Sequence, residues 1–183
     1  MTGVQTCALP ISIVPENIPG IHKPHVVWAP DAELGKAPVG QEIVIVGAGQ
    51  VGLEAAVDYA QQGKKVTVIE MIDDPEKLID SFSRPLLKKK EEDGLQFDVL
   101  YGTALQEVKD DCIVAKDVKS GELKEIKADS VLLAMGIRPN FELVDELRHS
   151  CAETSVAIVG DCNNKAATIS EAVNQAFQTC LHI

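Results

Sequence analysis

The sequence "EIVIVGAGQVG" (Glu42–Gly52) joins a continuous β-branched run to a glycine-rich turn. An uninterrupted apolar run of this length is typical of a strand buried on both faces of a parallel sheet. A helical pattern with one apolar stripe follows the turn and is expected to end at Gly63. A second buried strand, "KVTVIE" (Lys65–Glu70), comes next. This order of strand, helix and strand with short connections predicts a βαβ unit built on a parallel sheet.

The turn itself has the G-x-G-x-x-G spacing and the chemistry that a dinucleotide pyrophosphate requires. Phosphate oxygens accept hydrogen bonds from backbone N–H groups at close range, and the helix N-terminus adds a partial positive charge. Gly47 permits the tight turn, Gly49 lets the backbone meet the phosphates, and Gly52 lets helix and strand pack closely. The alternative is a glycine turn with a structural role only. The predicted cofactor-binding loop consists of Gly47, Ala48, Gly49, Gln50, Val51 and Gly52.

Two acidic residues accompany this loop. Glu70 ends the second strand about 20 residues later, where a carboxylate accepts hydrogen bonds from a ribose 2′-hydroxyl and repels a 2′-phosphate. The next residues, "MIDD" (Met71–Asp74), contain no Arg or Lys, so NADH is favoured over NADPH. The alternative is that Glu70 only faces solvent at the end of a strand. Glu54 lies in the first turn of the helix, where an acid also stabilises the macrodipole, so the residues alone favour a structural role for it.

The chain before the first strand is rich in proline, and Ile13–Gly40 is expected to be an extended connector. After the βαβ unit, a helix ending near Gly94 and a third strand around Leu95–Tyr101 are expected. The stretch Ala104–Lys127 has the pattern of two or three short antiparallel strands. "DSVLLAMG" (Asp129–Gly136) again has the composition of a buried strand.

The last part of the chain predicts one more strand and one more helix. The strand is "SVAIVG" (Ser155–Gly160), and the helix begins near Thr168, where Thr168 and Glu171 have the spacing of a capping box.

Composition excludes several classes of function. The chain has 183 residues and a formal net charge of −11, which argues against binding nucleic acid through a basic face. Its five cysteines contain no C-x-x-C pair and its four histidines no ligand spacing, so no metal site is expected. The sequence shows no signal peptide and no apolar stretch of membrane-spanning length, which favours a cytoplasmic protein with free thiols and no membrane partner.

The first residues, "MTGVQTCALPIS" (Met1–Ser12), follow no helical or strand period. They resemble the translation of a widely used sequencing adapter, read through Ile11 into the first base of the Ser12 codon. We therefore expect residues 1–12 to be an artefact and the natural sequence to be cut just before Ile13, so that the chain is a fragment of a longer protein.

Four motifs in order, "GAGQVGLE", "VTVIE", "LLAMGIRPN" and "VGDC", resemble the pyridine nucleotide–disulfide oxidoreductase superfamily of flavoproteins with two dinucleotide-binding domains. "IPGIHKPHVVWA" (Ile18–Ala29) and "GDCNNKAATISEAVNQAFQTC" (Gly160–Cys180) are most similar to the C-terminal part of NADH:flavin oxidoreductases related to 2,4-dienoyl-CoA reductase and 2-enoate reductase. The resemblance covers the chain from Ile13 onward.

The resemblance implies a domain organisation, because in this superfamily the NAD domain is inserted into the FAD domain. Residues 13–40 would be the connector and the end of the first FAD-domain segment, residues 41–136 the NAD(H)-binding domain, and residues 137–183 the C-terminal FAD-domain segment. The expected fold is therefore α/β: a Rossmann-like domain with a parallel sheet and an antiparallel meander, flanked by parts of a truncated FAD-binding domain.

The resemblance also implies further site residues. Gly160 and Asp161 match a Gly-Asp pair whose Asp reaches the ribityl and phosphate region of the flavin, and Glu54 matches an acid near the nicotinamide. Gly136, within "LLAMGIRPN", completes the candidate cofactor-binding residues. No side chain is assigned as a catalytic acid, base or nucleophile.

The implied function is that of an electron-input module. The parent enzyme would take hydride from NADH to FAD and pass electrons on to reduce an enoate or enoyl-CoA-type alkene. The glycine loop of the FAD domain and the barrel domain with FMN and an iron–sulfur cluster would lie in the missing part, so the isolated fragment is expected to be inactive. The alternatives are a fragment of a disulfide-reductase-type flavoprotein, whose redox cysteine pair is also absent here, and a nucleotide-binding module without catalysis.

Overall fold

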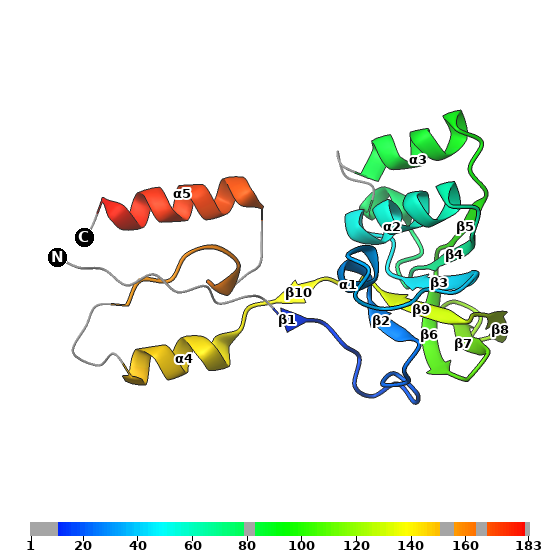
Figure 1. Ribbon diagram of the computed structural model, residues 1–183, viewed down its shortest axis with the longest axis horizontal. Coiled ribbons are helices and arrows are strands. Elements are labelled where there is room, and N and C mark those ends of the chain that lie inside the picture. Colours follow the sequence, from blue (N-terminus) through cyan, green and yellow to red (C-terminus); the bar gives the residue numbers. More distant parts are fainter. Residues whose placement is uncertain (1–10, 79–82, 151–155, 164–167, 182–183) are drawn as a thin grey trace. The chain divides into compact units, whose positions relative to one another are not determined.

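The computed structural model describes residues 11–78, 83–150, 156–163 and 168–181 (Figure 1). The chain forms two compact units, one of Val14–Gly136 and one of Met1–Ile13 together with Ile137–Ile183. The assignment of residues 41–136 and 137–183 to an NAD and a FAD domain stays a prediction.

A five-stranded parallel sheet forms the centre of the first unit. Its strands, in spatial order, are β2 (Val26–Trp28), β9 (Ser130–Leu133), β3 (Glu42–Val46), β4 (Lys65–Ile69) and β5 (Phe97–Leu100). From β3 the chain runs outward through β4 to β5 and then returns to β9, on the other side of β3. The direction of winding therefore reverses between β3 and β9, which is where ligands of open parallel sheets bind, at the carboxyl ends of the strands.

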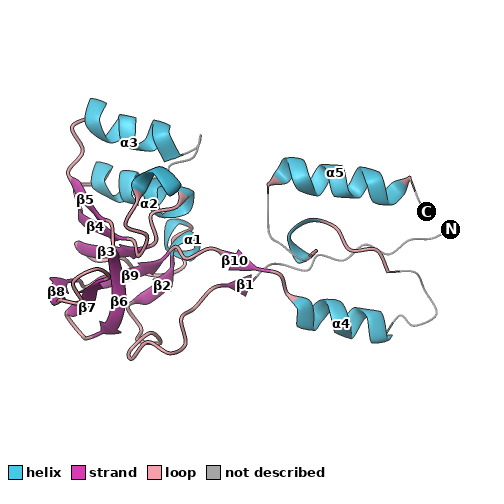
Figure 2. Ribbon diagram, turned by 180° about the vertical axis from the view of Figure 1, so that it is seen from behind, coloured by secondary structure: helices cyan, strands magenta, loops and turns pink. Residues whose placement is uncertain are grey.

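Helices cover one face of this sheet and a small antiparallel sheet covers the other (Figures 1 and 2). The helices are α1 (Ala29–Glu33), α2 (Gln50–Gln61) and α3 (Ser83–Glu92), with the 3₁₀ turn η1 at Pro75–Lys77. The antiparallel strands are β6 (Thr103–Val108), β7 (Cys112–Asp117) and β8 (Leu123–Lys127). The fold class expected from the sequence, a Rossmann-like parallel sheet with an antiparallel meander, is confirmed in this unit.

The two hydrophobic cores explain why β3 is apolar from Ile43 to Val46. Ile43 and Ile45 pack on the helical side, whereas Val44 and Val46 pack on the side of the antiparallel sheet. Successive side chains of a strand point to opposite faces, so a strand that is covered on both faces cannot alternate with polar residues.

The stretch expected to be an extended connector contributes regular structure instead. Residues Val26–Trp28 form β2, which pairs in parallel with β9, and α1 follows directly. Pro24 and Pro30 bracket this strand rather than interrupt it, and Pro30 lies in the first turn of α1, where a missing N–H costs nothing. The first unit therefore begins well before Gln41.

The second unit is described by itself. It contains a short antiparallel pair, β1 (Ile11–Ser12) with β10 (Ile137–Arg138), then α4 (Phe141–Ser150), the 3₁₀ turn η2 (Gly160–Cys162) and α5 (Ile169–Cys180). Neither β10 nor α4 was expected from the sequence. The adapter origin of residues 1–12 is untested and stays a prediction, although Ile11 and Ser12 take part in this pair.

The sequence predicts a strand over Ser155–Gly160, and this prediction is wrong for residues 156–160, which the structure describes. Val156–Val159 have no regular structure, Gly160 begins η2, and Ser155 lies outside the described residues. An apolar run becomes a strand only when a neighbour accepts its backbone hydrogen bonds, and none of the described strands pairs with this run. The start of α5 is confirmed, because the Thr168 hydroxyl accepts a hydrogen bond from the backbone N–H of Glu171 at 3.3 Å.

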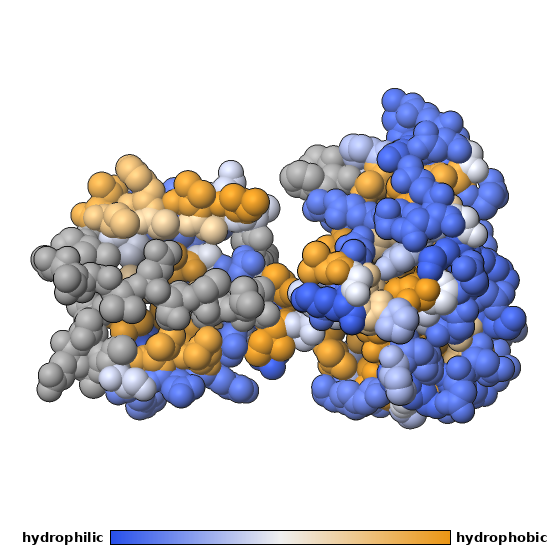
Figure 3. Space-filling view, in the orientation of Figure 1, coloured by the Kyte–Doolittle hydropathy of each residue, from blue (hydrophilic) through white to orange (hydrophobic). Residues whose placement is uncertain are grey.

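The surface of α5 is strongly apolar along one side (Figure 3). The side chains that form this face and are exposed are Ile169, Val173, Phe177 and Leu181. Within the described ranges, no helix combines the length and the apolar character that crossing a membrane would require.

Candidate nucleotide-binding site

The glycine loop follows β3 at the carboxyl edge of the sheet, where both neighbouring strands hold it. Gly47 donates its N–H to the carbonyl of Ile69 at 2.9 Å, and Ala134 donates its N–H to the carbonyl of Val46, also at 2.9 Å. Gly47 has a φ of 110°, and a Cβ there would lie 2.5 Å from the Ala134 carbonyl oxygen. Both the conformation and the close approach of β9 therefore require glycine at this position.

Gly52 is required for a different reason, which is the close packing of α2 on the loop. A Cβ at Gly52 would lie 1.9 Å from the carbonyl oxygen of Gly47. No side chain fits at that distance, so any residue other than glycine would push the first turn of α2 away from β3.

Gly49 differs from both, because the protein itself leaves room at this position. It is the N-cap of α2 with an ordinary φ of −72°, and a Cβ there would meet no atom within 4 Å. Neither backbone strain nor packing within the described chain explains this glycine. The open space lies beside the first backbone N–H groups of α2, which have no acceptor within their helix.

Glu70 lies at the end of β4 and binds the loop directly. The residue is only 9% exposed. One carboxylate oxygen accepts a hydrogen bond from the N–H of Ala48 at 3.0 Å, and the other accepts one from the N–H of Ile72 at 2.8 Å. The alternative that Glu70 merely faces solvent is therefore wrong. Burial, and then the negative charge of Glu70, raises the pKa of the Tyr101 hydroxyl above its usual value.

Glu54 lies on the exposed side of α2 and accepts a hydrogen bond from the Gln50 side chain at 2.9 Å. Burial, followed by the charges of Glu54 and Asp58, raises the pKa of Glu33. The three acids therefore lie close enough along α1 and α2 to repel one another. Gln50 and Val51 are exposed at the start of α2, and the side chain of Gln50 donates the hydrogen bond to Glu54.

Gly136 follows β9 at the same edge of the sheet as the loop. It is exposed and has a φ of 88°, a conformation that favours glycine.

Gly160 and Asp161 belong to the other compact unit, so they are described apart from the loop. Gly160 has a φ of 75° and donates its N–H to the side-chain oxygen of Gln175 at 2.9 Å. This hydrogen bond ties the Gly-Asp turn to α5.

Sequence reasoning missed a basic side chain beside the segment that follows β4. Lys119 comes from the turn between β7 and β8, and its ammonium group lies 2.8 Å from the carboxylate of Asp73. Lys77 and Asp74 form a second pair at 3.6 Å, and Arg84 and Glu76 form a third at 3.4 Å. The residues next to Lys119 in the sequence do not predict its position, because only the pairing of β6 with β7 brings it to the segment after Glu70.

Within the described part of the chain, no group of three His, Cys, Asp or Glu residues could hold a metal ion. Three cysteines are free thiols there, Cys112, Cys162 and Cys180, whereas Cys7 and Cys151 lie outside the described residues.

Several proteins of known function are similar to this chain in sequence. The chain is 32% identical to bilirubin reductase of Mediterraneibacter gnavus over 160 residues, which are 87% of this chain and 24% of that protein. It is 30% identical to cinnamate reductase of Clostridium sporogenes over 164 residues, 86% of this chain and 23% of that protein. It is 34% identical to dihydrolipoyl dehydrogenase of Haloferax volcanii over 121 residues, 65% of this chain and 26% of that protein. The chain thus spans about a quarter of these relatives.

The fold is shared with solved structures. A 2-naphthoyl-CoA reductase complex superimposes with a TM-score of 0.75 at 24% identity, over 95% of this chain and 26% of that chain. Thioredoxin reductase of T. acidophilum superimposes with a TM-score of 0.61 at 19% identity, over 90% of this chain and 59% of that chain. The model of the family described as pyridine nucleotide-disulphide oxidoreductase matches residues 6–176. The chain therefore belongs to the pyridine nucleotide-disulphide oxidoreductase family.

Proposed function

We propose that this chain is the nucleotide-binding part of a flavoprotein oxidoreductase that takes hydride from NADH to FAD. The parent protein would pass the electrons on to an enoate or enoyl-CoA-type alkene. Membership of the family supports the redox class, and the similarity to a cinnamate reductase supports an activated alkene as the acceptor.

The hydrogen bond between Ala48 and Glu70 is the single observation that carries the proposal. It fastens the glycine loop to the end of β4, at the edge where the sheet reverses its winding. A buried carboxylate that accepts a loop N–H holds the loop in one conformation before any ligand arrives. Such a loop presents the first N–H groups of α2 as ready donors for a pyrophosphate.

The residues of the loop suit a pyrophosphate, because Gly49 leaves open space beside the first backbone N–H groups of α2. Gly49 borders open space, whereas Gly47 and Gly52 are fixed by packing. In the proposal, the backbone from Ala48 to Gly52 holds the pyrophosphate, and Gly136 borders the site from β9. Glu54 would lie on the nicotinamide side.

Glu70 would hold the adenosine ribose. An ionised carboxylate has about four acceptor positions, and among the described residues Ala48 and Ile72 use two of them. The remaining positions can accept hydrogen bonds from ribose hydroxyls. The negative charge would repel a 2′-phosphate, so the proposal favours NADH over NADPH.

Gly160 and Asp161 would contribute to a FAD site that this chain holds only in part. The nicotinamide supplies a hydride when bound, and the flavin accepts it. FMN and an iron–sulfur cluster would belong to other parts of the parent. The free thiols Cys112, Cys162 and Cys180 fit a cytoplasmic location, which we include in the proposal.

A disulfide-reductase-type parent is the second candidate. The 34% identity to a dihydrolipoyl dehydrogenase favours it, although that match covers 65% of the chain, against 86% for cinnamate reductase. A C-x-x-C or C-x4-C pair in the remainder of the gene would decide for this candidate.

Calorimetric titration of the whole chain with NADH, and in parallel with NADPH, tests the proposal. Binding of NADH in the micromolar range and weaker binding of NADPH is the expected result. Failure to bind either nucleotide would contradict the assignment of the loop.

A further inference from the structure

In the segment after Glu70, a charged side chain from a distant part of the sequence lies close to the proposed ribose site. Ile72 donates its N–H to the Glu70 carboxylate at 2.8 Å, and Asp73 is the next residue. The α-carbons of neighbouring residues are about 3.8 Å apart. Asp73 therefore directly follows Ile72, and Ile72 contacts Glu70, the residue that is proposed to bind the ribose.

Backbone contacts fix Lys119 beside Asp73. Gly102 donates its N–H to the carbonyl of Ile72 at 3.2 Å, and its own carbonyl accepts the N–H of Val118 at 2.8 Å. Gly102 has a φ of 63°, and a Cβ there would lie 3.3 Å from the Asp73 Cβ. These contacts hold the turn that carries Lys119 against the segment that carries Asp73.

The two side chains form an accessible ion pair rather than a buried one. The Lys119 ammonium and the Asp73 carboxylate are 2.8 Å apart, and the side chains are 75% and 39% exposed. The carboxylate raises the pKa of Lys119, and the ammonium lowers the pKa of Asp73, so both groups are charged at neutral pH. An exposed pair of this kind is weak, and a stronger anion can compete for the lysine.

We propose that Asp73 is a specificity-determining residue for NADH over NADPH. It pairs with Lys119, so this lysine is not available to bind the 2′-phosphate of NADPH. The inference rests on the proposed function, because it concerns the ribose that Glu70 would bind. It also explains how the chain can favour NADH although a lysine lies nearby. Glu70 would repel the phosphate, and Asp73 would keep Lys119 in an ion pair.

The test is the affinity of the whole chain for NADH and NADPH after Asp73→Asn, measured by calorimetry at low salt. Asparagine keeps the size of the side chain and removes the ion-pair partner of Lys119, which leaves Asp117 and Asp74 as more distant acidic neighbours. NADPH should bind about tenfold more tightly than it does to the unmodified protein, since one charge-assisted contact to phosphate is added. The affinity for NADH should change by less than about twofold, because NADH has no 2′-phosphate.

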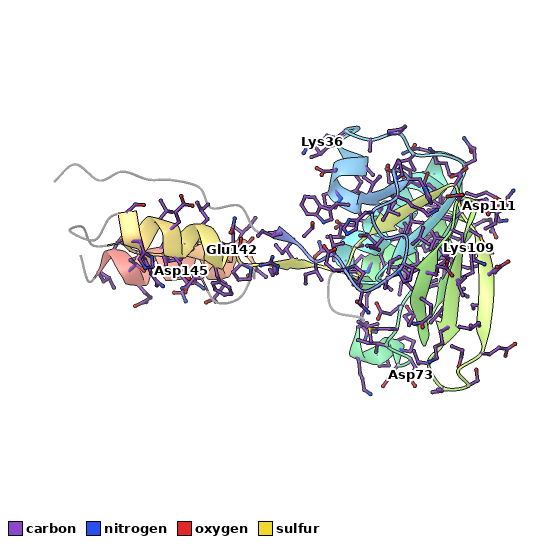
Figure 4. The ribbon with its side chains drawn as sticks, turned by 90° about the horizontal axis from the view of Figure 1, so that it is seen from below. Lys36, Asp73, Lys109, Asp111, Glu142 and Asp145 are labelled. Atoms are coloured by element: carbon purple, nitrogen blue, oxygen red, sulfur yellow. The ribbon has the colours of Figure 1, made fainter. Side chains whose placement is uncertain are left out.

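Two further variants make the cause identifiable. In the double variant Asp73→Asn/Lys119→Ala, the gain in NADPH affinity should disappear. Glu125→Gln is the matched control, because Glu125 pairs with Lys109 on the same small sheet. Lys109 belongs to the turn at the other end of β7, and Figure 4 shows Lys109 and Asp111 well apart from Asp73. Glu125→Gln should leave both affinities unchanged.

Unchanged NADPH affinity in Asp73→Asn, with NADH binding intact, would overturn the inference and leave the proposed function standing. A gain that persists without Lys119, or that Glu125→Gln reproduces, would overturn it as well, because net charge would then be the cause. If the unmodified protein binds neither nucleotide, the proposed function itself fails.

Discussion

The carbonyl oxygen of Gly47 occupies the place that a side chain of Gly52 would need, at 1.9 Å from an added Cβ. The first turn of α2 therefore rests directly on the loop that precedes it. Gly52→Ala should lower the free energy of unfolding by about 2–3 kcal/mol, as overpacking against a fixed backbone does. Urea unfolding followed by circular dichroism measures this loss.

Gly49→Ala is the control for that experiment, because its Cβ would meet no atom within 4 Å. Its cost should stay below about 1 kcal/mol, which is the difference between glycine and alanine at an N-cap. Equal losses for Gly49→Ala and Gly52→Ala would contradict the packing described here.

Glu70→Gln should destabilise the first unit even without ligand. Glutamine has one carbonyl oxygen, so it can satisfy either Ala48 or Ile72 but cannot accept from both as the two carboxylate oxygens do. A buried N–H without an acceptor costs about 1–3 kcal/mol. Thermal unfolding of Glu70→Gln and Glu54→Gln should show a clear loss only for Glu70, since Glu54 is exposed. A similar stability of the two variants would contradict this role of Glu70.

Asp129 makes the stability of the first unit depend on pH in the acid range. Partial burial raises the pKa of its carboxyl group. Hydrogen bonds from the N–H groups of Glu42 and Gln41 and from the Ser130 hydroxyl, together with the charge of Lys64, outweigh this effect and hold the pKa below its ordinary value. A carboxyl group with a lowered pKa stabilises the folded state above its unfolded pKa, and this contribution is lost as the pH falls through the folded value.

Asp129→Asn should therefore cost about 1 kcal/mol of unfolding free energy at pH 7, because the group is exposed and its hydrogen bonds are partly replaced by water. The difference from the unmodified protein should shrink as the pH falls below the ordinary pKa of an aspartate, because the folded-state pKa is lowered. Urea unfolding at pH 7, 5 and 3 checks it, and a difference that does not depend on pH would count against the charge of Asp129 as the cause.

Local patterns predicted those parts of the fold that neighbouring residues determine. The run Glu42–Val46 and the glycines after it specify β3, the loop and the start of α2, because burial on two faces and a tight turn both leave a signature in consecutive residues. Thr168 likewise marked the start of α5 through its own hydrogen bond.

Features that depend on distant partners could not be predicted in this way. Val26–Trp28 becomes a strand because β9 lies beside it, whereas Val156–Val159 lack a partner among the described strands. Lys119 meets Asp73 only through the pairing of β6 with β7. The burial of Glu70 also follows from tertiary contacts, since its position in the sequence fits a buried and an exposed side chain equally well.

The affinity for NADH of Gly49→Val, compared with the unmodified chain, tests whether a pyrophosphate binds at the glycine loop. Valine at this position would project into space that the protein leaves open, where the pyrophosphate is proposed to lie. Gln61→Val, at the exposed far end of the same helix, controls for the change in helix propensity. We expect Gly49→Val to stay folded and to lose NADH binding, whereas Gln61→Val should keep it. A folded Gly49→Val with unchanged affinity would show that no pyrophosphate binds at this loop.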